Sequence, residues 1–446
     1  MPKSLAQASS MRPLRHAVAV LLQLVVVGVL VGLACWPLNH IDQVQDNLLA
    51  LLPGFSDGIW TTPALLLAAA PVVVMPLLLL LQRGWLRAGS GSGIPQTMLS
   101  LEHPDRANHL LGAGATYGRL VLWTLASVAL FPLGREGPVV QVGAAVAHAL
   151  RNRFPRLLQA ISPHQMMAIG AGAGLAGGFN SPLMGLIFVM EELTGRFQLA
   201  VLWPGAVVCL GAALISNLGG IGLFPLGLAA ERVAEPLQLL WALPLGIGGG
   251  VLGGLFARML VGGTTWLKPR LAQHPTAWGL ALGSGLSALL LLTGGWSGGD
   301  GEVLMRYMLD GAPPQPVPGS PLGVMGWLLV LAARLVAPVL ALAAGVPGGL
   351  IDPAFSLGAV FGSGLMEFLG SSSALGLALG MAGGLAGATQ LPLTTVLFAM
   401  RLAGDSQWLW GLLFSAVLGA YVGRRVQAKP VYHALTAISE QPPAQA

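Results

Sequence analysis

Long apolar runs recur along the whole chain, and they constrain its fold more than any other feature. Each run is close to the ~20 residues that cross the hydrocarbon core of a bilayer as a helix. Only 9% of the residues are charged, whereas about a quarter are charged in a soluble domain. The sequence therefore predicts an all-α polytopic membrane protein. The clearest runs are Ala17–Trp36, Pro63–Leu81, Leu199–Ile215, Ala277–Leu292 and Met325–Ala344.

The basic residues lie in short clusters beside these runs. This pattern fits the positive-inside rule better than it fits a nucleic-acid surface, so no nucleic-acid partner is expected. Residues 40–58 carry three aspartates and no lysine or arginine, which places them on the opposite side. Both termini are then cytoplasmic, and we expect a plasma membrane protein. The first run is too long for a signal peptide, so we interpret it as a retained helix. The clusters are Arg83 and Arg87; Arg151, Arg153 and Arg156; and Arg424, Arg425 and Lys429.

Few residues support metal, cofactor or enzyme chemistry. The two cysteines, Cys35 and Cys209, lie in apolar stretches, and the eight histidines show no zinc spacing. No phosphate-binding motif of the Walker type occurs. Gly54–Gly58 (GFSDG) matches the pattern of a serine nucleophile at Ser56 but lacks its strand–turn–helix context. We therefore expect no cofactor, no metal and no enzyme, with an intramembrane hydrolase as a remote alternative.

Two pairs of segments indicate an internal repeat. Gly174–Met190 and Gly384–Met400 are identical at eight of seventeen positions, and Gly134–Ala144 and Gly349–Ala359 share glycine, proline, glycine and alanine. The separations, 210 and 215 residues, are nearly equal. We therefore predict two transmembrane repeats around a binding site, although the residues alone leave their relative orientation open. The predicted boundaries are 1–16 for the N-terminal segment, 17–216 for the first repeat, 217–235 for the connection, 236–424 for the second repeat and 425–446 for the C-terminal segment.

Two glycine-rich segments, one in each predicted half, precede helix-like runs. Gly91–Pro95 (GSGIP) adds the hydroxyl of Ser92, and Gly345–Pro353 (GVPGGLIDP) contains Gly349, Leu350 and Ile351. Glycines let backbone N–H groups approach a ligand, and a helix N-terminus adds positive potential, so both segments suit a dehydrated anion. Plain turns that serve helix capping or close helix packing are the alternatives.

Two acidic features lie next to apolar runs. Glu136, in Gly134–Pro138 (GREGP), is a functional candidate because a charge at membrane depth costs about 2.5–3.5 kcal/mol on insertion scales. A simple ion pair between Arg135 and Glu136 is its alternative. The doublet Glu191–Glu192 ends an apolar helix, and one of its acids is expected to point inward while the other meets solvent or a base such as Arg196. Solvation of a helix end is the alternative for the doublet.

Four of these elements together resemble the chloride-contacting elements of the CLC chloride channel and transporter family, in the family's order. They are GSGIP, GREGP, the PGG-x-x-x-P segment and the tyrosine of Lys429–Tyr432 (KPVY). The resemblance runs from about residue 17 to residue 437. It implies a homodimer of tilted and broken helices, with two inverted-topology repeats in each subunit and an anion path of its own. It is closest to the prokaryotic proton-coupled exchangers.

By this resemblance the protein is a chloride–proton antiporter with a glutamate gate at Glu136 and an internal proton acceptor at Glu192. A passive chloride channel is the alternative, which the glutamate at 192 disfavours. Ser92, Pro138 and Tyr432 resemble the chloride or nitrate type rather than a fluoride-selective relative. Two departures stand out: Asp352 replaces a small residue and is a possible modulator, and Arg401 replaces an acid. The expected chloride-binding residues are Ser92, Gly93, Ile94, Arg135, Gly349, Leu350, Ile351 and Tyr432.

Overall fold

The computed structural model describes residues 3–56, 58–155, 159, 161–218, 238–309, 323–403 and 408–440. Most of the predicted connection at 217–235 lies outside these residues. The described chain is helical throughout, and its only strand-like pairing is an isolated bridge between Gly134 and Gly349. The all-α prediction is confirmed.

The α-helices follow one another with short connections. In the first half they are α1 (Lys3–Leu49), α2 (Thr62–Arg83), α3 (Ile94–Glu102), α4 (Ala107–Leu110), α5 (Ala113–Val128), α6 (Glu136–Arg153), α7 (Pro163–Phe179), α8 (Pro182–Phe188) and α9 (Leu199–Ser216). In the second half they are α10 (Ala242–Gln273), α11 (Pro275–Leu292), α12 (Glu302–Leu309), α13 (Gly323–Leu342), α14 (Ile351–Phe368), α15 (Ser373–Thr389), α16 (Pro392–Ala403), α17 (Leu409–Val426) and α18 (Val431–Glu440).

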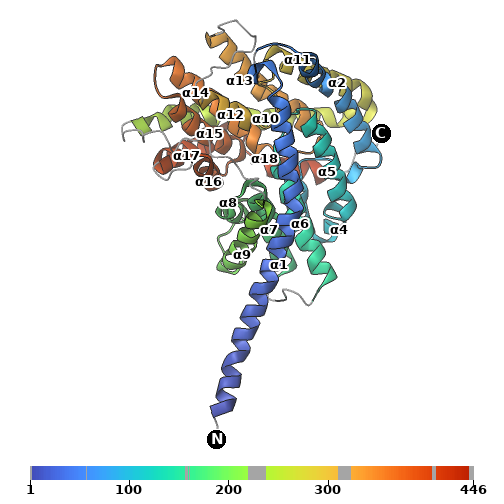
Figure 1. Ribbon diagram of the computed structural model, residues 1–446, viewed down its shortest axis with the longest axis vertical. Coiled ribbons are helices and arrows are strands. Elements are labelled where there is room, and N and C mark those ends of the chain that lie inside the picture. The colour runs from blue at the N-terminus through green and yellow to red at the C-terminus, as the bar shows by residue number, and fades with distance from the viewer. Residues whose placement is uncertain are drawn as a thin grey trace.

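Six of the described helices are long and apolar enough to cross a membrane. Four of them contain runs named from the sequence, and the fifth, Gly323–Leu342, ends two residues before its run, Met325–Ala344, does. The sixth is Leu239–Gln273. The first differs from expectation, because α1 continues to Leu49 and extends beyond the helix bundle at its N-terminal end (Figure 1). Asp42 and Asp46, which were assigned to the acidic stretch at 40–58, therefore belong to a helix that reaches the protein interior.

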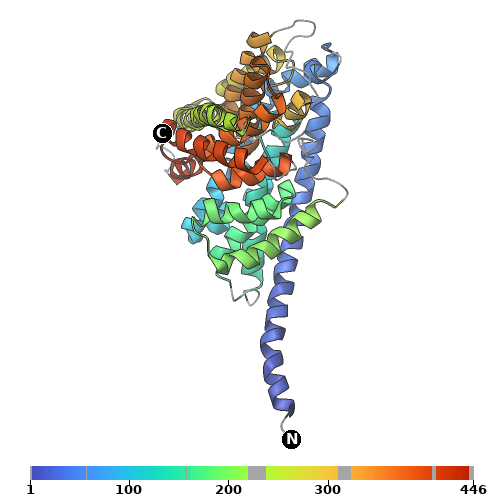
Figure 2. The ribbon, with the colours of Figure 1, turned by 90° about the vertical axis from the view of Figure 1, so that its left-hand side faces the viewer.

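The same packing relationships occur in both halves. Helix α1 packs on α9 as α10 packs on α17, and α6 packs on α7 as α14 packs on α15. Helices α6 to α9 and helices α14 to α17 form two adjacent groups, which meet where α8 contacts α16 (Figures 1 and 2). Helices α7 and α15 even end alike, in the left-handed residues Asn180 and Gln390.

Small residues permit the closest of these contacts. A Cβ on Gly143 of α6 would collide with the carbonyl oxygen of Gly170 on α7, and a Cβ on Gly358 of α14 would collide with that of Gly380 on α15. The dispersion contacts of closely packed backbones replace the hydrophobic effect, which does not drive helices together inside a bilayer. Glycine is thus required at the same contact in both halves.

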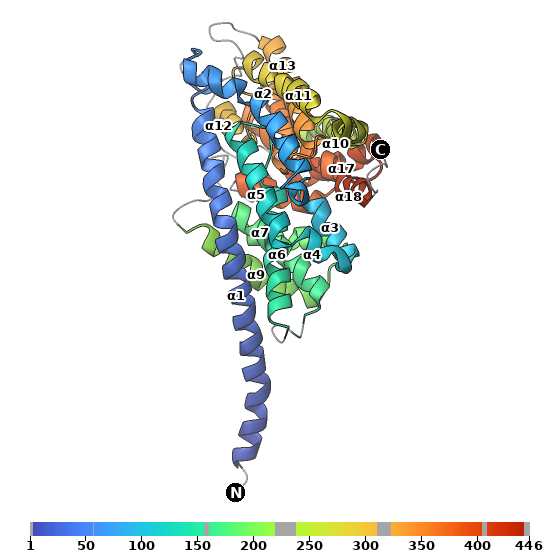
Figure 3. The same cartoon turned by 90° about the vertical axis from the view of Figure 1, so that its right-hand side faces the viewer.

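The predicted C-terminal segment is part of the bundle. Helix α18 packs against α3, α10 and α15, and it buries Val431 and Tyr432 completely. Figure 3 shows α18 near α3 and α10. The chain therefore returns to the centre of the protein after α17, and this return brings Tyr432 to the predicted site.

Candidate anion and proton site

The segment Gly134–Pro138 (GREGP) and its counterpart in the second half, Gly349–Pro353, face each other at the centre of the molecule. The N–H of Gly134 donates to the carbonyl of Gly349 at 3.1 Å, and the N–H of Gly349 donates back to Gly134 at 2.7 Å. These are the residues that the repeat aligns with each other. Helices α6 and α14 begin two residues later, so their N-terminal ends, each with unpaired N–H groups and positive potential, lie close together.

Glu136 is the first residue of α6 and is completely buried. One oxygen of its carboxylate accepts a hydrogen bond from the backbone N–H of Asp352, in the first turn of α14. The other oxygen, Oε2, has no hydrogen-bond partner among the described residues. An anionic group of the first half therefore occupies the N-terminus of a helix of the second half.

Asp352 brings a second acid to the same place. Its side chain is buried, its Oδ2 has no hydrogen-bond partner among the described residues, and its carboxyl lies close enough to that of Glu136 for their charges to interact. Two like charges this close in a buried site repel strongly. Asp352 could therefore modulate the site, as predicted from the sequence, by acting on the charge of Glu136.

Ser92 presents its hydroxyl from the N-terminal end of α3. Its Oγ is buried without a partner among the described residues. Ser92 packs so closely on Gly137 of α6 that a Cβ there would collide with its carbonyl oxygen, which places the α3 turn directly beside Glu136. The turn itself is anchored to the second half, because the N–H of Gly91 donates to the carbonyl of Gly345 at 2.8 Å.

Two of the expected anion donors have other partners. The N–H of Gly349 is bound by Gly134, and the N–H of Gly93 donates to the side chain of Gln96 at 2.8 Å. These two amides are therefore not free for an anion, contrary to expectation, because one pairs with the other half and the other is capped by a side chain of α3. Leu350 and Ile351 begin α14 and Ile94 begins α3, where the first N–H groups of a helix have no intrahelical acceptor.

Tyr432 completes the set from α18. The residue is fully buried, and its hydroxyl has no hydrogen-bond partner among the described residues. The hydroxyl lies within electrostatic range of Glu136, Asp352 and Glu192. Tyr432 therefore lies within range of the pair Glu136 and Asp352 and also of Glu192.

A cavity of about 510 Å³ leads to Ser92. Its wall includes the basic side chains of Arg83, Arg87 and Lys268, and the serines Ser90 and Ser92. Basic side chains around a cleft raise the local concentration of anions. The cavity therefore has the charge that an anion path requires.

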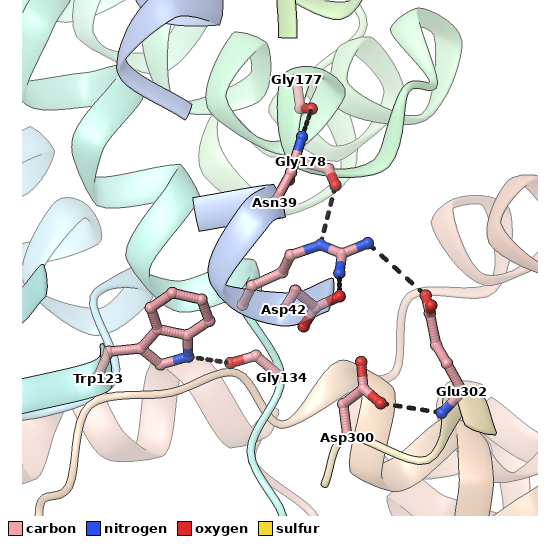
Figure 4. A network of polar contacts seen from close by, with 9 residues as sticks. Asn39, Asp42, Trp123, Gly134, Gly177, Gly178, Asp300 and Glu302 are labelled. Atoms are coloured by element: carbon pink, nitrogen blue, oxygen red, sulfur yellow. Dashed lines mark hydrogen bonds and ion pairs between the residues drawn. The ribbon is translucent and has the colours of Figure 1, made fainter. Parts of the chain in front are cut away.

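The partners of the Arg135 side chain are groups other than Glu136. It forms an ion pair with Asp42 of α1, it lies 3.6 Å from Glu302 of α12, and its Nε donates to the carbonyl of Gly178 at 3.0 Å (Figure 4). Neither the predicted direct role in chloride binding nor the alternative Arg135–Glu136 pair fits this arrangement. Arg135 instead ties α1, α6, α7 and α12 together at the outer edge of the site.

The acidic doublet is divided between two roles. The carboxylate of Glu191 accepts hydrogen bonds from the N–H groups of Leu393 and Thr394, at 3.0 and 2.7 Å, and from the Thr394 hydroxyl at 2.7 Å. It therefore caps α16 of the other half, whereas Arg196 or solvent was expected as its partner. Glu192 is buried, as predicted for one member of the doublet, and both lie in a π-helical turn, Val189–Leu193. Such turns are frequent at functional sites.

Comparison with known proteins identifies the family. The family model "Voltage gated chloride channel" matches residues 72–424. The chain belongs to this CLC family. A cyanobacterial structure titled as a slow Cl⁻/H⁺ antiporter has a TM-score of 0.76 and 23% identity, over 94% of this chain and 98% of that one. A eukaryotic CLC transporter shares the fold with a TM-score of 0.76 and 20% identity, over 96% of this chain and 76% of that one. A CLC-type fluoride/proton antiporter does so with a TM-score of 0.68 and 24% identity, over 92% of this chain and 96% of that one. The protein is thus an integral membrane protein of a transport family.

Two buried arginines of this CLC chain were not identified from the sequence. Arg119 of α5 donates to the carbonyls of Gly91 and Ser90, at 3.1 and 2.9 Å, and so holds the Ser92 turn. Arg334 of α13 donates to three carbonyls of the turn before α12, those of Trp296, Gly298 and Gly299. Both begin the tripeptide Arg-Leu-Val, 215 residues apart, and this match in the sequence was the signal that could have found them.

The turn that Arg334 holds repeats the Ser92 turn with different chemistry. Gly299–Glu302 (GDGE) corresponds to Gly91–Ile94 (GSGI), and the two glycines of each turn have positive φ. Asp300 stands where Ser92 stands in the first half, and one of its oxygens, Oδ2, is buried without a partner among the described residues. The two turns of this CLC protein therefore share a backbone conformation but differ in their side chain: one presents a hydroxyl and the other a carboxylate.

Three further points from the sequence concern a metal, a serine nucleophile at Ser56 and the departure at Arg401. Carboxylate oxygens of Asp42, Asp300 and Glu302 lie within 4.8 Å of one another, but Arg135 already supplies positive charge to Asp42 and Glu302, so they give no reason to expect a metal. Ser56 donates its hydroxyl to the carbonyl of Leu52, and no base is bound to it among the described residues. The Nε of Arg401 is buried without a partner among the described residues, and nothing in the structure explains this departure from the family.

Proposed function

We propose that this CLC protein is a secondary active transporter that exchanges chloride for protons. The observation that carries the proposal is the position of Glu136, whose carboxylate is held by the N–H of Asp352 between the N-terminal ends of α6 and α14. A site that holds a carboxylate with backbone N–H groups also suits a halide, because both are monovalent anions. Glu136 and chloride then compete for one place.

Competition couples the two ions. Ionised Glu136 occupies the anion site and closes the path. Protonation removes its charge and weakens its bond to the N–H of Asp352, so that chloride replaces it and the carboxylic acid leaves with its proton. Each turnover therefore moves chloride in one direction and protons in the other without ATP.

The chloride ligands follow from the groups that lack partners. The hydroxyls of Ser92 and Tyr432 are both buried and unsatisfied within the described structure, and a bound anion would accept from both. The N–H groups of Ile94, Leu350 and Ile351 complete the proposed site. Arg135, Gly93 and Gly349 support it through the contacts described above.

Glu192 is the proposed inner proton acceptor. It is buried, and both it and Glu136 act electrostatically on Tyr432, so this proposed chloride ligand lies within range of both acids. A passive channel, the alternative, needs no second buried acid. We therefore place Glu192 on the proton route and favour exchange.

The remaining assignments rest on the family and on the repeated packing. We propose two inverted-topology repeats, at 17–216 and 236–424, with both termini on the cytoplasmic side of the plasma membrane. We also propose a homodimer. Exposed apolar side chains on α9 and α17, such as Leu214 and Phe414, suit a second copy within the lipid. Cross-linking in vesicles at two concentrations tests the dimer.

Flux measurements in reconstituted vesicles test the exchange. An outward chloride gradient should drive proton uptake by the wild type. Glu136→Ala and Glu192→Gln should both retain chloride flux and lose proton uptake, because each removes a proton carrier and leaves the N–H and hydroxyl donors in place. Glu367→Gln, at an exposed acid of α14, is the matched control. Chloride flux without proton movement in the wild type would establish the channel instead.

A further inference from the structure

Among the described residues, the buried acid Glu192 lies close to His433, a side chain that reaches the protein surface. Its Oε1 is buried and has no hydrogen-bond partner among the described residues, and the Nε2 of His433 lies 3.9 Å from it. The side chain of Glu192 is 3% exposed and that of His433 is 43% exposed. His433 therefore touches both the buried acid and the surface.

The surface around His433 belongs to the side marked by basic residues. Helix α18 follows directly on the cluster Arg424, Arg425 and Lys429, which the positive-inside rule assigns to the cytoplasm. At the far end of the same helix Glu440 pairs with the exposed His103. The exposed part of His433 thus lies at an aqueous edge.

Helix α18 separates His433 from the anion cavity. The cavity is lined by Leu435, Ile438 and Ser439, which share one face of the helix. His433 is about 200° away from Leu435 around the helix axis, at about 100° per residue. The anion cavity and His433 therefore lie on different faces of one helix.

Helix α16 keeps the neighbouring acid, Glu191, out of this contact. Both of its oxygens accept hydrogen bonds from the first turn of α16, so Glu192 alone faces His433. The titratable groups that act on Glu192 are thus Glu191, Tyr432 and His433. Among them, the neutral imidazole has one ring nitrogen that donates and another that accepts, so it can take up a proton and pass one on.

We propose that His433 passes protons between the cytoplasmic water and Glu192. The imidazolium Nε2–H gives its proton to the carboxylate of Glu192, and the neutral ring takes another from water; the reverse sequence carries protons inward from Glu192. A rotation of the exposed ring that brings the two atoms about 1 Å closer makes the hydrogen bond that the transfer needs. The inference rests on the proposed exchange, since a passive channel has no use for this step.

Vesicle fluxes of His433→Gln and His433→Ala test the relay. Glutamine keeps a polar side chain of similar size but carries no proton. Chloride flux should stay within about twofold of the wild type, while proton uptake falls by about tenfold or more. Added imidazole should restore proton uptake to His433→Ala, which a merely structural role would not allow. His103→Gln, at an exposed histidine outside the contact, should leave both fluxes unchanged.

The outcomes separate the two proposals. Absent proton uptake in the wild type overturns the exchange itself. Coupled transport by the wild type with unchanged proton uptake in His433→Gln overturns only the relay. A parallel loss of chloride and proton flux that imidazole does not reverse also overturns it, because His433 would then support the fold rather than carry protons.

Discussion

The carboxylate of Glu136 fills the space that a side chain on Gly349 would need. A Cβ built on Gly349 overlaps the carboxylate, and one built on Gly134 would meet it too. The two glycines that pair with each other across the halves therefore also leave room for the carboxylate of Glu136. This contact explains why the repeat keeps glycine at both positions, although only one half carries the acid.

Gly349→Ala should displace the carboxylate of Glu136 from its place at α14. We expect chloride flux to become weakly dependent on pH, since the gate no longer closes when it ionises. The same change in a Glu136→Ala background should have little further effect, because the overlap is gone. Equal effects of Gly349→Ala in both backgrounds would show that the methyl group acts elsewhere. Chloride flux between pH 4.5 and 7.5 measures each variant.

Asp352→Asn should tighten chloride binding at neutral pH. The acid lies in the first turn of α14, where an ionised carboxylate offsets part of the helix-end field that attracts chloride. Charges at helix ends are worth about 0.3–1 kcal/mol, so we expect about a two- to fivefold lower Kd. The difference should shrink at a lower pH at which Asp352 is protonated, because protonation removes the charge that distinguishes aspartate from asparagine.

Calorimetry with chloride at both pH values measures this effect. Asp352→Ala is a second variant, which removes the side chain and keeps the backbone N–H that binds Glu136. Identical affinities of wild type and both variants at neutral pH would mean that the charge of Asp352 does not reach the chloride site.

Arg119→Gln should weaken chloride binding more than Arg334→Gln does. Both arginines are completely buried and both hold a glycine turn, but only the turn of Arg119 carries Ser92. Each loss leaves buried carbonyls without donors, which costs about 1–3 kcal/mol per group, so both variants should melt at lower temperature. Thermal unfolding in detergent gives the shared effect, and chloride titration gives the difference. Equal losses of affinity would remove the specific role of Arg119.

Arg135→Gln should destabilise the protein without abolishing chloride binding. The change leaves Asp42 and Glu302 buried without their positive partner, and breaking a buried pair in this way costs about 3–5 kcal/mol. Arg135→Gln combined with Asp42→Asn should recover part of the loss, because one unpaired charge is removed. Unfolding in detergent at several chloride concentrations measures stability and binding together. If chloride no longer stabilised the double variant, Arg135 would have to be a direct ligand of chloride, contrary to this prediction.

Much of the architecture was readable in the sequence because its signals are local. Apolar runs of bilayer length predict helices whatever their neighbours are, and the match between residues 174–190 and 384–400 reveals a repeat without any knowledge of packing. The unsatisfied hydroxyls of Ser92 and Tyr432 and the buried side chains of Glu136 and Glu192 are likewise consistent with roles assigned to these residue types in their motifs. Whether they perform those roles is for the flux measurements to establish.

Only the tertiary structure decided which groups meet. The sequence offered Gly349 as an amide donor and Arg135 as an anion ligand, yet Gly349 is bound by Gly134 and Arg135 by acids of α1 and α12. It gave no sign that Glu191 caps α16 or that His433 lies against Glu192, about 200 to 240 residues away along the chain. The physical reason is that composition and periodicity report what a segment prefers by itself. Hydrogen bonds between the two halves depend on how their helices pack against each other.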